Sequence, residues 1–415
     1  MKILWFTITP CGASEKLKVG SQGGGWLSAL EKSLVSSGKV ELHVCFQCET
    51  DIPSFSCGGV TYHPTNRVRL KNRLLGHFLG RGFKSNPILT YIDIISRVKP
   101  DLIHVHGTEE DFGLIQSVTD RPVVISMQGI LTNYISKYFS GISFARLLVS
   151  EGFFSHLYFK SVLSNYFIFR ANAKRERLIL DYAKHVIGRT AWDRRSTAVL
   201  APKAYYYHVD EILRDPFYDG VWSRQEFSTP VNIVSVLGIA PYKGYEMVLN
   251  VARILRDQTG MNFTWFVAGL SPKDSLVSIM DNWLGAQGNV KLLGTLSGKE
   301  IRDLLLNSDI FCQVSHIENS PNSLCEAMLL GMPIVASFAG GTDSMLCAGE
   351  EGILVQDGDP LSLAGAILEL CRDTEGAARM GHAARTRAQS RHNADNIVKD
   401  LLSVYSLVSK VVYFP

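Results

Sequence analysis

The feature that most constrains the fold is an alternation of short apolar runs with helical stretches, and this alternation occurs twice along the chain. The first series of apolar runs falls at about residues 2–7, 40–45, 102–105, 123–126, 185–187 and 204–207. The second series falls near residues 231–236, 263–267, 290–292, 310–314, 334–336 and 352–355. Strands that alternate with helices are typical of parallel α/β sheets. The pattern therefore predicts an α/β protein with two such sheets.

A chain of 415 residues also exceeds what one hydrophobic core usually supports, which favours two domains. The segment 215–230 is polar, rich in turn residues and without periodicity, so we expect a linker with the boundary near residue 222. We predict an N-terminal Rossmann-like domain at residues 1–221 and a C-terminal Rossmann-like domain at 222–392. Residues 393–415 carry apolar side chains at helical spacing and predict a helix, which either caps its own domain or crosses back to the first.

Composition narrows the classes of function. Hydrophobic residues make up 46% and charged residues 20%, as in ordinary globular proteins. A net charge of +3 lacks the dense basic footprint of nucleic-acid binding, so we expect no nucleic-acid partner. The short apolar start resembles a first strand more than a signal peptide, and no apolar run is long enough to span a membrane. We therefore expect a cytoplasmic protein with reduced cysteines.

A glycine-rich loop follows the first expected strand and leads into a helix. Glycines such as Gly24 and Gly25 let a backbone approach a phosphate, and a helix N-terminus offers free N–H groups to an anion. The spacing is not G-x-G-x-x-G, so a dinucleotide fingerprint is not matched. The loop is a candidate donor-binding element, and a tight turn that merely needs glycine is the alternative.

Two polar side chains end neighbouring strands of the first half. His106 and Gln128 each stand at a strand end and are followed by glycine. In open α/β sheets ligands bind outside the carboxyl ends of the strands. Both residues are therefore candidate catalytic residues, with a purely structural histidine as the alternative for His106.

The second half contains a candidate phosphate-binding region. Lys243 precedes a helix, where its ammonium group suits a diphosphate, although a solvated loop lysine is also possible. A helix capped by Ser320 or Asn322 follows the strand near 310–314. The first backbone N–H groups of that helix have no intrahelical partner and can bind phosphate; they belong to Asn322, Ser323 and Leu324.

Two glutamates flank these N–H groups. Glu318 lies in the loop after the strand, and Glu326 lies within the helix. Carboxylates accept hydrogen bonds from sugar and ribose hydroxyls. Together with the phosphate-binding groups, the two acids predict a nucleotide-sugar site.

These residues resemble glycosyltransferase family 4, a large group of retaining enzymes with the GT-B fold. The most specific element is Glu-x7-Glu, from Glu318 to Glu326, followed by Ala-Met-Leu-Leu-Gly-Met-Pro-Ile-Val-Ala and then Gly340-Gly341. The resemblance implies two Rossmann-like domains that face each other across a cleft. It also implies that Glu318 contacts hydroxyls of the donor sugar, that Glu326 binds the nucleotide ribose, and that Lys243 is the lysine of the family.

Two positions depart from the family pattern. Many members have Gly-Arg-Leu ahead of the lysine, with the arginine on the donor diphosphate, whereas this chain reads Gly238-Ile239-Ala240. Many members also have histidine where this chain has Gln128, and glutamine cannot titrate. A proton-transfer role at Gln128 is therefore in doubt.

The implied function is retaining hexosyl transfer from a nucleotide diphosphate sugar to an acceptor hydroxyl. No Asp-x-Asp pair stands at a strand end, so we expect neither a metal nor another cofactor. The alternatives are a sugar-nucleotide 2-epimerase of the same fold, an NAD-dependent oxidoreductase and an inactive binding protein.

The acceptor side is suggested by two further features. The stretches 175–177, 188–193 and 211–218 resemble members that build bacterial surface polysaccharides, which implies a glycan or polyprenyl-linked acceptor.

Residues 67–84 contain no Asp or Glu and have leucines at helical spacing, and their basic residues include Arg67, Arg69, Lys71 and Arg73. A basic amphipathic helix of this kind binds an anionic membrane surface or a lipid diphosphate, in this case at the inner membrane face. A solvated helix or loop whose leucines face the core is the alternative.

Overall fold

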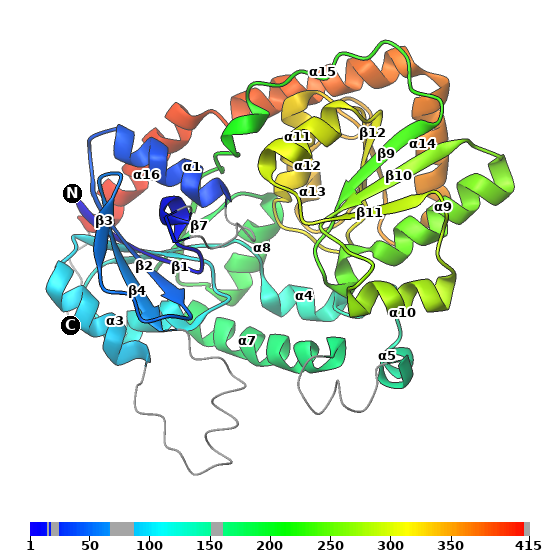
Figure 1. The fold of residues 1–415 in the computed structure, drawn as a ribbon. Coiled ribbons are helices and arrows are strands. Elements are labelled where there is room, and N and C mark those ends of the chain that lie inside the picture. The colour runs from blue at the N-terminus through cyan, green and yellow to red at the C-terminus, as the bar shows by residue number, and fades with distance from the viewer. Residues whose placement is uncertain (15, 18–24, 67–86, 151–160, 411–415) are drawn as a thin grey trace. The chain divides into compact units, whose positions relative to one another are not determined.

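The computed structural model describes residues 1–14, 16–17, 25–66, 87–150 and 161–410 (Figure 1). Gly24 and the basic stretch with Arg67, Arg69, Lys71 and Arg73 lie outside the described residues. The chain forms two compact units. The first unit comprises Met1–Thr132, Ile168–Ile212 and His392–Pro415, and the second comprises Asn133–Phe167 and Leu213–Arg391.

The first unit is built on a sheet with the strand order β3-β4-β2-β1-β5-β6-β7-β8. All neighbouring strands pair in parallel except β3 and β4, which form an antiparallel hairpin. The strands are β1 (Lys2–Thr7), β2 (Glu41–Cys48), β3 (Phe55–Cys57), β4 (Val60–Asn66), β5 (Leu102–His106), β6 (Val123–Ser126), β7 (His185–Gly188) and β8 (Tyr205–His208). The longer helices are α1 (Gly25–Ser36), α3 (Pro87–Val98), α8 (Ala191–Leu200), α16 (Ala394–Ser409) and most of α7 (Val162–Tyr182).

Each expected strand of this half is present within about three residues, but the hairpin β3–β4 was not predicted. β3 has only three residues, and Gly58-Gly59 turns the chain with φ of 58° and 81°. Pro64 interrupts the apolar pattern of β4, which nevertheless pairs with β2 over its whole length. Short strands and an internal proline weaken the period-two signal on which such a prediction rests.

The C-terminal helix belongs to the first unit. α16 packs against α1 and β5, and Tyr405 is fully buried. The Tyr405 hydroxyl accepts a hydrogen bond from Trp5 Nε1 at 2.9 Å and is 2.7 Å from His104 Nδ1. Of the two expected positions for this helix, the structure therefore has the one on the first domain.

The second unit is built on an all-parallel sheet with the strand order β11-β10-β9-β12-β13-β14. The strands are β9 (Val231–Val236), β10 (Phe263–Ala268), β11 (Val290–Gly294), β12 (Ile310–Gln313), β13 (Ile334–Phe338) and β14 (Ile353–Gln356), close to the predicted runs. The helices are α5 (Phe144–Ser150), α9 (Tyr245–Thr259), α10 (Ser275–Leu284), α11 (Gly298–Leu306), α12 (Asn322–Leu330), α13 (Thr342–Met345), α14 (Pro360–Arg372), α15 (Thr374–Arg391) and most of α4 (Leu131–Lys137).

The division between the units differs from the expected boundary at residue 222. Phe217 and Trp222 both lie in the core of the second unit. The Trp222 N–H donates to the carbonyl of Leu330, and its indole Nε1 donates to the carbonyl of Ser308, both at 2.8 Å. Aromatic side chains thus anchor the supposed linker to the second core, and the division falls after Ile212.

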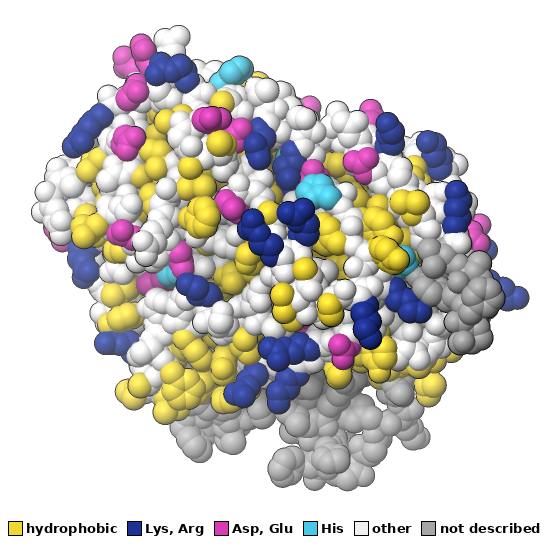
Figure 2. All heavy atoms as spheres, turned by 180° about the vertical axis from the view of Figure 1, so that it is seen from behind, with side chains coloured by type: hydrophobic (Ala, Val, Ile, Leu, Met, Phe, Trp, Pro, Cys, Tyr) yellow, Lys and Arg dark blue, Asp and Glu magenta, His cyan; other side chains and the backbone are white. Residues whose placement is uncertain are grey.

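The surface carries apolar side chains as well as charged ones. Figure 2 shows apolar side chains at the surface of one face, among lysine and arginine side chains. Of the described helices, none combines the length and apolar character needed to cross a bilayer. All eight cysteines are free thiols, as expected.

Candidate functional site at the strand ends

In the second unit, two loops meet at the carboxyl ends of β9 and β12. The loop after β9 contains the short 3-10 helix η4 (Pro241–Lys243) and Gly244, whose φ is 82°. A Cβ on Gly244 would lie 2.2 Å from the carbonyl oxygen of Val314, so only glycine allows this approach. The His316 N–H donates to the Tyr242 carbonyl at 2.8 Å, which joins the two loops directly.

This contact brings together two residues that the sequence singled out. Lys243 Nζ lies 2.6 Å from Glu318 Oε1, and the two side chains are 25% and 11% exposed. The main chain of Glu318 is fixed by the glycine pair after β13. The Gly341 N–H donates to the Glu318 carbonyl at 2.9 Å, and a Cβ on Gly340 would lie 1.9 Å from the same oxygen. Gly340-Gly341 therefore positions the loop that carries Glu318.

The second acid, Glu326, has a different environment. It lies in α12, is 2% exposed, and accepts two hydrogen bonds from Arg214 Nε and Nη2 at 2.6 and 2.7 Å. Burial raises the pKa of Glu326, while the hydrogen bonds and charge of Arg214 oppose this shift. Two of the roughly four lone-pair positions of the carboxylate remain for another donor.

Arg214 was not among the predicted site residues. It lies 112 residues from Glu326 in the sequence, so no local periodicity or spacing connects the two. Its only signal was its place in the stretch 211–218, which resembles polysaccharide-building family members. A bidentate arginine fork holds a carboxylate with defined geometry, so Arg214 is a functional candidate.

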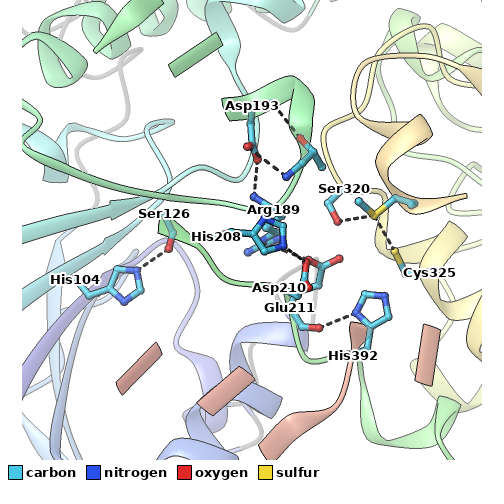
Figure 3. Close-up of polar contacts among 12 residues, drawn as sticks. His104, Ser126, Arg189, Asp193, His208, Asp210, Glu211, Ser320, Cys325 and His392 are labelled. Atoms are coloured by element: carbon cyan, nitrogen blue, oxygen red, sulfur yellow. Dashed lines mark hydrogen bonds and ion pairs between the residues drawn. The ribbon is translucent and has the colours of Figure 1, made fainter. Parts of the chain in front are cut away.

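The start of α12 differs from the expectation. Its N-cap is Pro321, and no side chain caps the helix, so the predicted cap by Ser320 or Asn322 is wrong. Ser320 Oγ instead lies 3.4 Å from Met345 Sδ. Figure 3 draws this contact of Ser320 as a dashed line. Proline offers no side-chain acceptor, which leaves the first N–H groups of the helix to other partners.

The three expected amide donors are not equivalent. The Leu324 N–H donates to the Pro321 carbonyl at 3.0 Å and is therefore engaged. The N–H groups of Asn322 and Ser323 make no hydrogen bond within the described part of the chain. Two amides at the positive end of a helix are thus available to an anion.

A buried charge cluster adjoins the Glu318 loop. His316 hydrogen-bonds Glu246 through Nε2 and Asp357 through Nδ1, the latter at 2.6 Å, and Lys137 Nζ lies 2.7 Å from Asp357 Oδ2. Burial alone lowers the pKa of His316, but the hydrogen bonds and charges of Asp357 and Glu246 outweigh it and raise this pKa to about 9. Sequence reasoning missed this cluster, although His316 stands two residues before Glu318.

In the first unit, the pairing of β5 with β6 brings the other predicted residues to one sheet edge. His106 is paired in register with Ser126, two residues before Gln128. His106 is 1% exposed, and its ring lies 3.8 Å from the ring of His104, centroid to centroid. Burial holds the pKa of His106 well below its usual range, so its ring is neutral. Neither ring nitrogen has a hydrogen-bond partner among the described residues.

The neighbouring strand end carries a buried arginine. Arg189 follows β7, is 6% exposed, and lies 3.6 Å from Glu211 and 4.1 Å above the ring of Trp26. Its N–H donates to Asp193 at 2.8 Å (Figure 3). Trp26 follows Gly25, the first residue of α1, so the described end of the glycine loop lies at the same edge of the sheet.

Part of the chain matches a known family and curated relatives. Residues 222–387 match the family described as glycosyl transferases group 1. The putative colanic acid biosynthesis glycosyltransferase WcaL of Escherichia coli is 26% identical over 43% of this chain and 45% of its own length. The amylovoran biosynthesis glycosyltransferase AmsK of Erwinia amylovora is 28% identical over 44% of this chain and 46% of its own length. The chain thus spans about half the length of these curated relatives.

Solved structures match over nearly the whole chain. Sucrose-phosphate synthase from Thermosynechococcus elongatus superposes with a TM-score of 0.73 at 14% identity, over 98% of this chain and 99% of that one. Anabaena HepE in complex with UDP-glucose superposes with a TM-score of 0.67 at 17% identity, over 98% and 100%. These likenesses confirm the predicted fold class of two Rossmann-like α/β units. Residues 222–387 therefore match the group 1 glycosyl transferases, and the chain has the GT-B fold class.

Proposed function

We propose that the chain is a retaining glycosyltransferase that moves a hexosyl unit from a nucleotide diphosphate sugar to an acceptor hydroxyl. One observation carries this proposal: Lys243, Glu318 and the uncapped start of α12 meet at one sheet edge, within the matched domain. A cation, two available amides and two carboxylates are the groups that a sugar nucleotide needs.

The donor is bound by the second unit in this proposal. Lys243 and the N–H groups of Asn322 and Ser323 stabilise the charge that develops on the leaving diphosphate, in place of a divalent cation. Glu318 accepts hydrogen bonds from the sugar hydroxyls. Glu326, held by Arg214, accepts hydrogen bonds from the ribose.

The first unit contributes polar groups at the ends of β5 and β6. Gln128 is partly exposed and can hydrogen-bond a sugar hydroxyl, while His106 is neutral and acts by hydrogen bonding. Gly25 opens α1, whose N-terminus favours a phosphate. We propose the same phosphate contact for Gly24, which precedes Gly25 in the sequence.

The donor is tested by ligand-induced stabilisation. Because HepE was solved with UDP-glucose, we place UDP and its sugars first, with the GDP and ADP series beside them. A ligand at 100 times its Kd stabilises the folded state by about 2.7 kcal/mol, which is readily seen as a rise in Tm. If no nucleotide raises the Tm, the proposed donor site is wrong.

The reaction is tested by product analysis. We expect the identified donor to give a new glycoside only when an acceptor is present. The proton NMR signal of the anomeric hydrogen in the product should show the same anomeric configuration as the donor sugar. Incubation without acceptor is the control, because conversion of the sugar nucleotide alone would indicate epimerisation. An inverted anomer would contradict the retaining mechanism.

We further propose a lipid-linked glycan of bacterial polysaccharide biosynthesis as the acceptor. Relatives named for colanic acid and amylovoran biosynthesis support this class. Transfer of radiolabelled sugar to polyprenyl-linked and to free oligosaccharides compares the two forms. Equal transfer to both would contradict a requirement for the lipid.

We also propose peripheral binding to an anionic membrane surface through the basic stretch in the sequence at residues 67–84. Exposed charges are screened over about 8 Å at physiological salt, so vesicle binding should fall as salt rises. The test is sedimentation with anionic and neutral vesicles, using wild type and a variant with Arg67, Arg69, Lys71 and Arg73 changed to Ser. Equal pelleting of both proteins, or of neither, would exclude this role.

A further inference from the structure

The loop after β5 places a carboxylate that neither the sequence pattern nor the proposed function uses. Gly107 has a φ of 98°, and a Cβ there would lie 2.1 Å from Glu109 Oε2 and 3.6 Å from Gln128 Cδ. The Glu109 carboxylate therefore folds back over the end of β5 and lies beside the Gln128 side chain. Glu109 as a whole is partly exposed, while its Oε2 atom is buried.

One oxygen of this carboxylate has no hydrogen-bond partner among the described residues. Oε2 of Glu109 is unsatisfied within the described part of the chain. Native proteins pair nearly all buried polar atoms, because an unpaired one costs about 1–3 kcal/mol and more when charged. His106, three residues earlier, has both ring nitrogens in the same condition. Two unsatisfied groups at one strand end indicate a place for a polar ligand.

Among the described residues, no lysine or arginine forms an ion pair with the Glu109 carboxylate. Glu176 of α7 adds negative charge, but its carboxylate is occupied by Thr108 Oγ1 and by the N–H groups of Leu131 and Thr132. Arg175 donates to the main-chain carbonyl of Glu109 and lies 3.9 Å from the carboxylate of Glu110.

These surroundings govern the titration of Glu109. Burial is the largest cause that raises its pKa, and the charge of Glu176 adds to it, while nearby backbone N–H groups oppose the shift. The pKa of Glu109 is raised to about 7. A carboxylate in this range is ionised in part at neutral pH and can both accept and release a proton.

We propose that Glu109 is a catalytic carboxylate of the first unit, which binds the acceptor hydroxyl and receives its proton during sugar transfer. This inference rests on the proposed glycosyltransferase function. Gln128 cannot titrate, and Glu109 supplies a titratable oxygen directly beside it.

The step balances as a substitution at the anomeric carbon. A bond forms between the acceptor oxygen and the anomeric carbon, and the bond from that carbon to the phosphate oxygen breaks. The electron pair of the broken bond leaves with the nucleoside diphosphate. The hydroxyl proton goes to Oε2 of Glu109 and is later released to solvent.

The proposal predicts a specific dependence on pH. Glu109 must be ionised to accept the proton, so kcat should rise with pH and level off above about pH 7. If Glu109 only supported the fold, its titration would change the stability of the protein with pH. The fall in kcat on the acid side of pH 7, the acid limb of the profile, would then persist after Glu109 is replaced.

The experiment compares Glu109→Gln and Glu109→Asp with the neighbouring control Glu110→Gln. General-base catalysis contributes about 10²–10⁴-fold, so Glu109→Gln should lower kcat for transfer by that order and abolish the acid limb. Glu109→Asp should restore part of the rate together with the limb. Nucleotide affinity by calorimetry should be unchanged in all three variants, and Glu110→Gln should transfer sugar normally.

Stability and infrared titration separate the possible outcomes. Burial favours the neutral form of Glu109, so Glu109→Gln should melt at the wild-type temperature or higher. In infrared titration, wild type should show the C=O band of a protonated carboxyl that disappears as pH rises through about 7, and the variant should lack this band. Transfer by Glu109→Gln within about threefold of wild type, or loss of nucleotide affinity and Tm together, would overturn the proposal. If wild type transfers sugar from none of the donors, the proposed glycosyltransferase function is wrong, and the catalytic role of Glu109 is wrong with it. The infrared band would then show only whether Glu109 titrates near pH 7.

Discussion

The two glutamates of one motif, eight positions apart in the sequence, are held in opposite ways. The loop after β12 holds Glu318 through its main chain, by way of Gly340-Gly341, and leaves its side chain 11% exposed beside Lys243. The helix α12 buries Glu326, whose side chain is held by both arms of Arg214. The first arrangement suits a group that meets a reacting sugar. The second suits a fixed element that binds and stabilises.

The largest expected effect concerns the loop. We expect Glu318→Gln to lower kcat by about 10²–10³-fold, since one positioned polar group at a reacting centre contributes this much. Nucleotide affinity by calorimetry should change little, because the proposed contact is to the sugar. Glu350→Gln, at an exposed position, is the matched control. A loss of nucleotide affinity equal to the loss of rate would remove the distinction between the two acids.

The second prediction concerns the helix. Arg214→Met leaves Glu326 buried without a partner, and breaking such a pair costs about 3 kcal/mol or more. For a unit of this size we expect the Tm to fall by roughly 10 °C, together with nucleotide affinity.

The double variant Arg214→Met/Glu326→Gln tests the cause of that loss. It removes the uncompensated charge, so more than half of the lost stability should return while nucleotide affinity stays low. An unchanged Tm in the single variant would show that Glu326 does not depend on Arg214.

The third prediction breaks the main-chain support of Glu318. Gly340→Ala places a Cβ against the Glu318 carbonyl and adds strain at a φ of 61°, so we expect about 2 kcal/mol of destabilisation and reduced kcat. Gly349→Ala is a close control, because Gly349 has a φ of 79° but no heavy atom within 4 Å of the added Cβ. Both variants share the strain, and only Gly340→Ala should shift the Glu318 loop. Equal stability and kcat in the two variants would count against this support.

The fourth prediction tests whether a side chain also anchors the Glu318 loop. The pKa of His316 is about 9 in the folded protein, against 6.5 ordinarily. A raised histidine pKa stabilises the fold fully below about pH 6.5, and this contribution is lost as pH rises through about 9. The stability advantage of wild type over His316→Gln should therefore shrink by roughly 2 kcal/mol between pH 7 and 9. Denaturant unfolding at several pH values measures it, and a constant difference would exclude a charged His316.

The smallest effect is expected at Lys243. Lys243→Met removes one charge-assisted contact to the diphosphate, which should weaken nucleoside diphosphate binding about tenfold. Binding of the nucleoside alone should not change, and Lys203→Met at an exposed turn of the first unit is the control. Equal weakening for nucleoside and diphosphate would move Lys243 away from the phosphates.

Much of the fold was predictable because its signal is local. Buried parallel strands are short apolar runs, so the runs at 231–236 and 123–126 coincide with β9 and β6. The hairpin β3–β4 escaped because a three-residue strand and Pro64 leave no such run. The predicted domain boundary near residue 222 differs from the observed one because Trp222 lies in a polar, turn-rich segment of the sequence but packs into the core of the second unit.

The sequence by itself determined that Lys243 and Glu318 follow strand ends and that Glu326 lies in the next helix, since position along a βα unit follows from periodicity alone. Tertiary structure decided what each of these groups touches. Arg214 reaches Glu326 across 112 residues, and Tyr405 reaches His104 across 301. The unsatisfied carboxylate oxygen of Glu109 likewise exists only because the chain folds back over Gly107. Side-chain partners are chosen by packing in three dimensions, and neither spacing nor composition encodes that choice.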